Sequence, residues 1–173
     1  MKVLVLTGPE SSGKSRLAAA IQAQFGGVLV GEYVRHFIDR EQRTPCYADI
    51  PTIARGQLEW EDGARARSPA LLILDTHLLS NILWSRTLFG DCPTWLEAEL
   101  LARRYDRHLL LSPEQVDWVD DGQRCQPELA ERQVFFEACR TWLAHHGQDH
   151  EVIEGDWETR RLKVLRRVAE WLD

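Results

Sequence analysis

The sequence predicts an α/β protein in which one doubly wound domain occupies residues 1–173. Three observations support this fold class. A glycine-rich loop lies between a short apolar run and a stretch of helix formers. A second apolar run ends in an acidic residue. Short apolar runs and longer helical patterns then alternate along the chain, which is typical of a parallel sheet covered by helices.

The first element is expected to be a buried strand over residues 2–7, because this run is short and almost wholly apolar. Gly-Pro-Glu-Ser-Ser-Gly-Lys-Ser follows over residues 8–15 and fits the phosphate-binding pattern G-x-x-x-x-G-K-[ST]. Residues 16–25 are rich in helix formers. Strand, loop and helix in this order are the context that the motif requires.

The residue types of this loop indicate how it would hold a nucleotide. Glycines allow the backbone to turn tightly, so that its amides cradle phosphates at the positive end of the following helix. Lys14 would place its charge between the β- and γ-phosphates, and Ser15 would offer its hydroxyl to Mg²⁺. A chance Gly-Ser turn is disfavoured by the flanking strand and helix. The residues expected to hold the nucleoside triphosphate are Gly8, Glu10, Ser11, Ser12, Gly13, Lys14, Ser15 and Arg16.

A second strand is expected at residues 28–30, and Glu32 and Arg35 follow it closely. Open α/β sheets bind their ligands at such strand ends. Glu32 is therefore a candidate to orient or deprotonate a substrate hydroxyl, and Arg35 a candidate to hold a transferring phosphoryl group. The first turn of an ordinary helix with a solvated ion pair is the alternative.

Residues 36–48 look irregular. A helix is then expected from Asp49, as its cap, with Pro51 in the first turn, to about Ala66. Gln57 and Trp60 share a face of this helix and either line a pocket or pack in the core.

Residues 70–76, Ala-Leu-Leu-Ile-Leu-Asp-Thr, predict a buried parallel strand with Asp75 near its carboxyl end. This is the Walker B arrangement, in which the acid helps to hold Mg²⁺ directly or through water. An Asp that caps the next helix is the alternative, and pairing with the phosphate-binding loop favours the site role. His77, which follows closely, is expected to be structural.

Helices are expected over residues 78–89 and 95–104, and a fourth strand over 107–112. Trp84 faces either a substrate or the core, and the core is favoured because buried aromatic residues usually pack. A fifth strand is expected at 151–154 and a final helix at 157–172. The turn between them, residues 155–157, is a candidate to contact a nucleotide base.

Residues 112–127 break the regular pattern, and a segment of this length in a compact domain is typical of a lid or a binding loop. The lid region is expected to extend over about 112–135, because a helix predicted over 128–146 contributes Arg132. Arg124 and Arg132 are the candidates to meet charge that develops during phosphoryl transfer. A solvated loop is the alternative.

The composition limits the classes of partner that this protein is expected to bind. The net charge of −6 argues against a nucleic-acid or anionic-membrane partner, while one local pocket can still bind a small anion. The four cysteines show no metal-ligand spacing, and they are expected to be reduced thiols of a cytoplasmic protein. No secretory signal is recognised, and no apolar run approaches the roughly 20 residues that span a bilayer.

Several motifs together resemble one family. They are GPESSGKS, EYVR after the second strand, IARGQ, LLILDT, RYDRHLLL and the DWVDDGQR stretch. In order and spacing they resemble the nicotinamide riboside kinase domain of NadR-like proteins, within the P-loop kinases. The resemblance implies a three-layer P-loop NTPase and nucleoside-kinase fold with a five-stranded parallel sheet and a helical lid. It implies ATP- and Mg²⁺-dependent phosphorylation of the riboside 5′-hydroxyl, which gives nicotinamide mononucleotide for NAD salvage.

The resemblance also implies roles for individual residues. Gly13, Lys14 and Ser15 would hold ATP and Mg²⁺, while Glu32 and Asp75 would flank the attacking hydroxyl. The residues implied around the phosphoryl group are Arg35, Arg124 and Arg132. Those implied beside the cationic pyridinium ring are Trp118 or Tyr33, by stacking, and Asp120 or Asp121, by charge. We expect neither a DNA-binding helix-turn-helix nor an adenylyltransferase domain in this chain.

Some alternatives stay open at this point. The acceptor is a small-molecule nucleoside, whether nicotinamide riboside or another nucleoside, or a nucleotide. A nucleotide-binding regulatory ATPase or GTPase module is a different class, although no N-K-x-D-like guanine-reading motif is found. Whether Glu32 or Asp75 is the base, whether ATP or GTP is preferred, and whether the protein forms a homo-oligomer are not decided.

Overall fold

The computed structural model describes residues 1–173 and confirms the predicted α/β class. Five parallel strands form one sheet in the order β2-β3-β1-β4-β5. The strands are β1 (Lys2–Thr7), β2 (Val28–Val30), β3 (Leu71–Asp75), β4 (Arg107–Leu111) and β5 (His150–Ile153). Each lies within one residue of its predicted bounds. β1 is central, so the phosphate-binding loop that follows it opens at the middle of the sheet's carboxyl edge.

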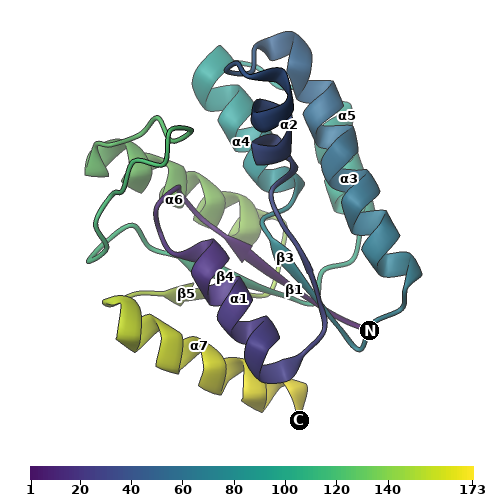
Figure 1. Cartoon of the computed structure of the whole chain (residues 1–173), viewed down its shortest axis with the longest axis vertical. Helices are drawn as coiled ribbons and strands as arrows, with labels where there is room; N and C mark the ends of the chain where they lie inside the picture. Colours follow the sequence, from purple (N-terminus) through teal and green to yellow (C-terminus); the bar gives the residue numbers. More distant parts are fainter.

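Seven α-helices surround this sheet. They are α1 (Lys14–Phe25), α2 (Tyr33–Glu41), α3 (Ile50–Ala66), α4 (Leu78–Phe89), α5 (Trp95–Ala102), α6 (Leu129–His145) and α7 (Trp157–Leu172). Figure 1 shows α1 and α7 together on one face of the sheet and the other helices beyond the opposite face. No helix is long and apolar enough to cross a membrane.

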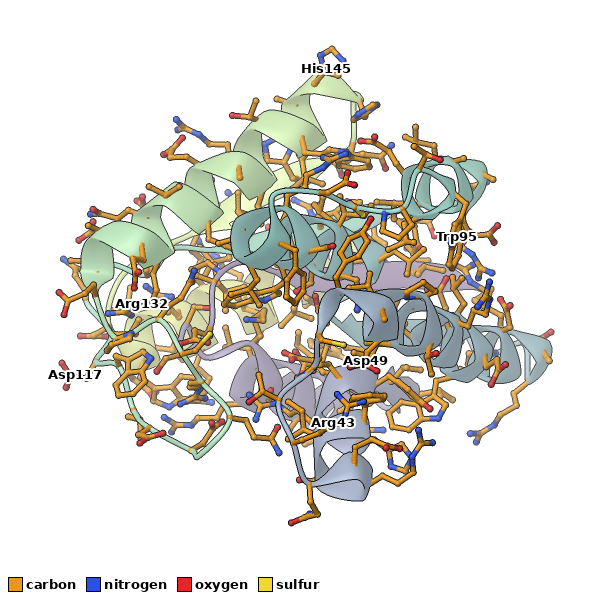
Figure 2. The ribbon with its side chains drawn as sticks, turned by 90° about the horizontal axis from the view of Figure 1, so that it is seen from above. Arg43, Asp49, Trp95, Asp117, Arg132 and His145 are labelled. Carbon is orange, nitrogen blue, oxygen red and sulfur yellow. The ribbon has the colours of Figure 1, made fainter.

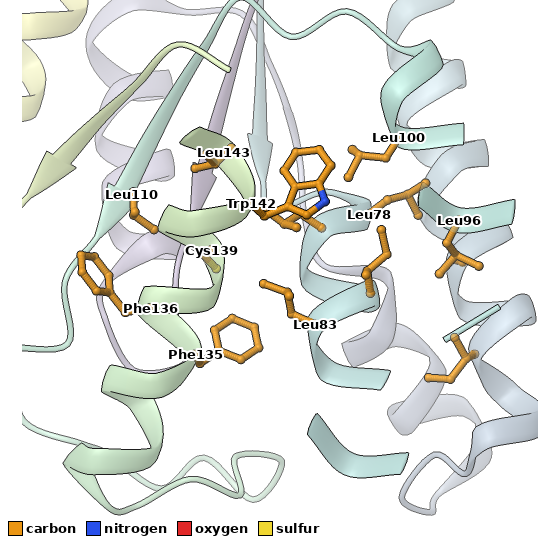
Figure 3. Packing of buried hydrophobic residues seen from close by; sticks show 14 of the residues in the cluster. Leu78, Leu83, Leu96, Leu100, Leu110, Phe135, Phe136, Cys139, Trp142 and Leu143 are labelled. Atoms are coloured by element: carbon orange, nitrogen blue, oxygen red, sulfur yellow. The ribbon is translucent and has the colours of Figure 1, made fainter. Parts of the chain in front are cut away.

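Alternating strand residues supply both faces of the sheet with apolar side chains. Leu4 and Leu6 of β1 belong to the cluster that α1 and α7 cover, whereas Val3 and Val5 face the other way. A third cluster joins α3, α4, α5 and α6, with Trp142 and Phe135 among its buried members (Figure 3). These clusters fix the strand ends and helix starts that surround the site.

The connection between β2 and α3 differs from its prediction. Residues 36–48 were expected to be irregular, but α2 continues to Glu41 and ends where Gln42 adopts a left-handed conformation. Val34, Phe37 and Ile38 of α2 recur at helical spacing, with Phe37 fully buried, so the pattern of a helix was present and the irregular interpretation was wrong.

Asp49 occupies the N-cap position of α3, as predicted, but its carboxylate makes no capping hydrogen bond to that helix because it has other partners. It forms a two-pronged ion pair with Arg43, at 2.6 and 2.9 Å, and accepts a hydrogen bond from the Cys46 amide at 2.8 Å (Figure 2). These bonds brace the short 3₁₀ helix Tyr47–Asp49 that precedes α3. Pro51 lies in the first turn of α3, as predicted.

Candidate active site

A cavity of about 790 Å³ opens at the carboxyl edge of the sheet. Its wall combines the phosphate-binding loop, the starts of α2 and α3, one face of α4 and the loop between β4 and α6. Cavities of this size at this position in α/β proteins are typical ligand sites. Most of the predicted site residues lie in or next to this wall.

The phosphate-binding loop has a backbone that demands glycine at two positions. Gly8 has φ +131°, and a Cβ placed there would lie 2.6 Å from the carbonyl oxygen of Leu111. Gly13 has φ +91°, and a Cβ there would lie 3.6 Å from the ring of Trp157. The loop therefore packs against the end of β4 on one side and the start of α7 on the other, in the nest-like form that binds phosphates.

Lys14, the first residue of α1, is buried with 7% of its surface exposed. Its ammonium donates to the carbonyl of Pro9 at 2.7 Å, and the Ser12 hydroxyl donates to the same oxygen at 2.8 Å. The ammonium thus lies folded over the loop, where a phosphate would meet it. Ser15 and Arg16 also line the cavity, and the Arg16 guanidinium stacks 3.7 Å from the ring centroid of Trp157.

Two carboxylates approach this lysine from neighbouring strand ends. Glu32 precedes α2, directly beyond β2, and Asp75 is the last residue of β3. Burial raises the pKa of Glu32, the charge of Lys14 opposes this rise, and the nearby charge of Asp75 adds to it. Asp75 is 6% exposed, and its Oδ1 is buried without a hydrogen-bond partner. An unpartnered carboxylate oxygen beside a phosphate site is suited to a hard cation.

Thr76 follows Asp75 and carries backbone strain. Its φ is +72°, a conformation that is rare for a β-branched residue. Its amide donates to the Leu6 carbonyl of β1 at 2.9 Å, while its buried hydroxyl oxygen has no partner. Thr76 lines the cavity, so this turn presents a strained residue to the site, as is common where a backbone is held for function.

The segment between β4 and α6 contains no helix or strand, as predicted, and it closes over the phosphate-binding loop. The Glu10 carboxylate accepts hydrogen bonds from the Trp118 indole at 2.9 Å, the Cys125 amide at 3.2 Å and the Gln126 amide at 2.6 Å. The Ser11 hydroxyl adds contacts to residues 117 and 119. We call residues 112–128 the lid loop.

The arginines predicted to meet the phosphoryl group are held by one lid carboxylate. Asp121 lies 2.7 Å from Arg35 and 3.3 Å from Arg124, and Arg35 also lies 3.8 Å from Glu32. Burial acts to raise the pKa of Asp121, but hydrogen bonds from Arg35 and the Gln123 amide keep it below its usual value. Both arginines line the cavity.

Arg132 of α6 is in a different state. It is 4% exposed, and its Nε and Nη1 have no hydrogen-bond partner. Figure 2 shows it on the side of α6 that faces the lid loop. A buried guanidinium without an anion is costly, so this position favours an anionic ligand.

Four residues expected to contact the substrate are occupied elsewhere. The Tyr33 ring packs edge-on against Trp60 and covers Gly56 of α3. Trp118 donates to Glu10, Asp121 binds the two arginines, and Asp120 accepts from the Gly122 amide at 2.9 Å. None of the four lines the cavity, so their positions do not support that expectation.

Two aromatic residues with open alternatives can now be placed. Trp84, for which the core was favoured over a substrate, packs on Phe135 of the core, with 5.0 Å between ring centroids, and also lines the cavity. Trp60 lies 39% exposed outside the main cavity, whereas Gln57 lines it. The Gln57 amide accepts from the Tyr33 amide at 2.8 Å and donates to the Gly31 carbonyl at 3.1 Å. Gln57 therefore fixes the turn that carries Glu32.

Arg160 is a structural residue that no sequence pattern singles out. It is fully buried, and its guanidinium donates to the carbonyls of Ser12, Ser112, Glu114 and Gly155. These carbonyls belong to the phosphate-binding loop, the start of the lid loop and the turn before α7. One side chain thus joins three segments that surround the nucleotide end of the cavity. A lone arginine on an amphipathic helix is normally interpreted as a solvated residue, and for this reason the buried position of Arg160 was not predicted.

Comparison with known proteins places this geometry in a family. A family model described as an AAA domain matches residues 3–160. The chain belongs to this AAA domain family. It is also 24% identical over 99% of its length to the trifunctional NAD biosynthesis/regulator protein NadR of Salmonella typhimurium, and equally to that of Escherichia coli. This AAA domain spans 43% of the length of these curated relatives. The resemblance to NadR-like proteins is therefore confirmed.

Solved structures show the same fold. A crystal structure of NadR in complex with NR aligns with a TM-score of 0.79 and 19% identity, over 99% of this AAA domain and 50% of that chain. Deoxyadenosine kinase from M. mycoides with bound dATP aligns with a TM-score of 0.66 and 12% identity, over 98% and 100% of the two chains. Thymidylate kinase from Ehrlichia chaffeensis aligns with a TM-score of 0.63 and 16% identity, over 99% of this chain and 98% of that chain. The fold is that of P-loop nucleoside and nucleotide kinases.

Proposed function

We propose that this AAA domain is an ATP-dependent kinase that phosphorylates the 5′-hydroxyl of nicotinamide riboside and yields nicotinamide mononucleotide. One observation carries the proposal: Glu32 and Lys14 line one cavity, and Asp75, the last residue of the strand next to β2, lies close enough for its charge to act on Glu32. The similarity to NadR, which a solved structure describes in complex with NR, supports the choice of acceptor.

The chemistry follows from how these groups are placed. Phosphoryl transfer depends mainly on positioning and on electrostatic stabilisation of the transferring group. The loop amides and Lys14 hold the phosphates, while Glu32 accepts the proton of the attacking hydroxyl. Arg35 and Arg124 line the same cavity and face the charge that spreads over the phosphoryl oxygens. Closure of the lid loop excludes water, which otherwise competes with the acceptor.

Mg²⁺ fits the oxygens that the site presents. The buried, unpartnered Oδ1 of Asp75 and the hydroxyl of Ser15 would hold it together with substrate phosphates. No group of three or more His, Cys, Asp or Glu residues forms a protein-only metal site. This agrees with an ion that keeps most of its ligands from phosphate and water. When bound, the ion neutralises phosphate charge.

An ATP-coupled assay with a panel of nucleosides and nucleotides tests the proposal. We expect turnover of nicotinamide riboside with Mg²⁺, and a loss of at least about 100-fold in kcat for Lys14→Ala. Lys163→Ala is a matched control, because Lys163 lies on α7 and donates to the Val152 carbonyl, outside the cavity wall. Turnover of other nucleosides without nicotinamide riboside would refute the acceptor, and equal activity of Lys14→Ala and wild type would refute the kinase.

A further inference from the structure

One face of α4 forms a wall of the cavity. Ser80, Asn81, Trp84 and Leu88 line the cavity, whereas Leu79, Ile82 and Leu83 between them are buried in the core. The lining residues recur at helical spacing, so they form one stripe. The stripe begins close after Asp75 in the chain and extends for about 12 Å at the helical rise of 1.5 Å per residue. It therefore leads away from the acids of the proposed reaction.

Aliphatic side chains from two other helices also line the cavity. They are Val34 and Ile38 of α2 and Ile50 and Ile53 of α3. On the α4 side, the Trp84 ring is supported by Phe135. A cavity lined by an indole and aliphatic side chains is suited to a flat aromatic group.

Asn81 is the carboxamide that α4 contributes to the cavity. Four carboxamides line the cavity, those of Gln57, Asn81, Gln115 and Gln123. Gln115 and Gln123 belong to the lid loop, and Gln57 is engaged at both its oxygen and its nitrogen. The Asn81 side chain makes no hydrogen bond within the protein. An unengaged amide offers a donor and an acceptor side by side, which match the edge of another amide. Asn81 also lies one helical turn from Trp84, so both can reach one ring.

The charges of the wall disfavour an anionic group placed against α3 or α4. Lys14, Arg16, Arg35 and Arg124 are the cations that line the cavity, and they come from the phosphate-binding loop, α1, α2 and the lid loop. α3 and α4 contribute none. A carboxylate or phosphate placed against α4 would lose its water without gaining an ion pair.

We propose that Asn81 and Trp84 select the acceptor by its base: Trp84 stacks on the ring, and Asn81 hydrogen-bonds an uncharged amide-like edge. The inference rests on the proposed kinase function and assigns its specificity to α4. The site accepts nucleosides whose base carries a carboxamide or lactam edge. It rejects the matching carboxylates, and it rejects nucleotides with a phosphate at this end.

The test compares nicotinamide riboside with nicotinic acid riboside, which differ only in amide against carboxylate, on the full chain. We expect wild type to prefer the amide by at least about 100-fold in kcat/KM. Asn81→Asp and Asn81→Ala should raise KM for the amide by about 10- to 100-fold with kcat within about threefold. Trp84→Leu should raise KM by about tenfold, and Trp60→Leu, a matched control outside the cavity, should leave it unchanged.

Some results would overturn the inference while leaving the kinase intact. These are equal use of the two ribosides, or an unchanged KM in Asn81→Ala and Trp84→Leu.

If another nucleoside is the acceptor, the same variants are assayed with it. A raised KM then supports the inference and refutes only nicotinamide riboside as the acceptor. If nothing turns over, calorimetry with nicotinamide riboside decides, and binding that is absent or is equal in wild type and Asn81→Ala overturns the inference. Thermal melts of all variants show whether each is folded.

Discussion

The Glu10 carboxylate of the phosphate-binding loop accepts a hydrogen bond from the indole nitrogen of Trp118 at 2.9 Å, across 108 residues of sequence. The same carboxylate accepts the amides of Cys125 and Gln126. The early and late parts of the lid loop are thus pinned to one side chain. Because this side chain belongs to the loop that binds phosphates, a nucleotide and the lid meet at the same place.

Glu10→Ala should release the lid loop. Three hydrogen bonds to a carboxylate are lost, each worth about 1.5–3 kcal/mol when buried and less at this partly exposed site. We expect amide hydrogen exchange in residues 117–126 to rise by at least about tenfold, with exchange in the sheet unchanged. Trp118→Phe removes one bond and should have a smaller effect. Equal exchange in Glu10→Ala and wild type would show that the lid is held by other contacts.

The substitution Glu32→Gln should lower kcat and raise the free energy of unfolding. Burial raises the pKa of Glu32, so folding favours its protonated form, and this contribution is lost as pH rises through the raised pKa. At pH 7 the neutral glutamine should therefore raise the free energy of unfolding, measured by denaturant titration. The variant should lose most of its kcat, since it cannot accept a proton. A less stable variant at pH 7 would contradict the assigned cause of the shift.

The same shift predicts the acid side of the wild-type activity profile. If Glu32 is the base, kcat should fall as pH drops through a pKa above the ordinary value of 4.5. An Asp75→Asn variant should lower that midpoint, because the Asp75 charge contributes to the rise. A profile flat down to pH 4.5 would instead make Asp75 the better candidate for the base.

Arg132→Met should leave the protein folded and weaken catalysis. The guanidinium is buried with two unpartnered nitrogens, so an apolar side chain of similar length removes a desolvation cost. We expect a free energy of unfolding equal to or above that of wild type, and kcat lowered by about 100-fold or more. Arg140→Met is a control, because Arg140 lies exposed on the same helix in an ion pair with Glu137. Equal kcat in both variants would remove Arg132 from the mechanism.

The core behind Asp75 should make the protein sensitive to acid. His77 lies between Tyr105 and His108, fully buried, with no partner at either ring nitrogen. Burial lowers the pKa of His77 well below normal and that of His108 to about 4. These groups stabilise the fold above pH 6.5, and the stability is lost as pH falls toward 4.

Denaturant titrations between pH 7 and pH 4 measure this loss. His77→Phe should reduce the slope of stability against pH while remaining folded at pH 7, because the site is dry and aromatic. His145→Phe, on the surface at the end of α6 (Figure 2), is the control. Parallel slopes in all three proteins would assign the acid sensitivity to other groups.

The sheet and most helices were predictable because their signals are local. Short apolar runs such as residues 71–74 are typical of a strand buried on both faces. The phosphate-binding loop was predictable because Gly8 and Gly13 have no steric substitute at their backbone angles. α2 was missed because it is only nine residues long and mostly polar, although Val34, Phe37 and Ile38 recur at helical spacing.

The wall of the cavity was harder to predict than its phosphate end. Whether Trp84 or Trp118 faces the cavity depends on helix rotation and on the path of an irregular loop, and both are set by long-range packing. The hydrogen bonds of Arg160 were hard to predict for the same reason, because its acceptors are main-chain carbonyls from three distant segments. The role of an acidic side chain at a strand end could be predicted from the sequence, but the two ion pairs that Asp121 forms with Arg35 and Arg124 could not.

Because Arg160 is bound through carbonyl oxygens, the identities of residues 12, 112, 114 and 155 are irrelevant to its bonds. The bonds themselves therefore require no particular side chain at these positions. Gly155 is constrained for another reason, since it has φ +102° and a Cβ there would lie 2.9 Å from Thr159. Engineering new substrates into this scaffold should leave Arg160 unchanged and vary the exposed side chains of the lid loop instead.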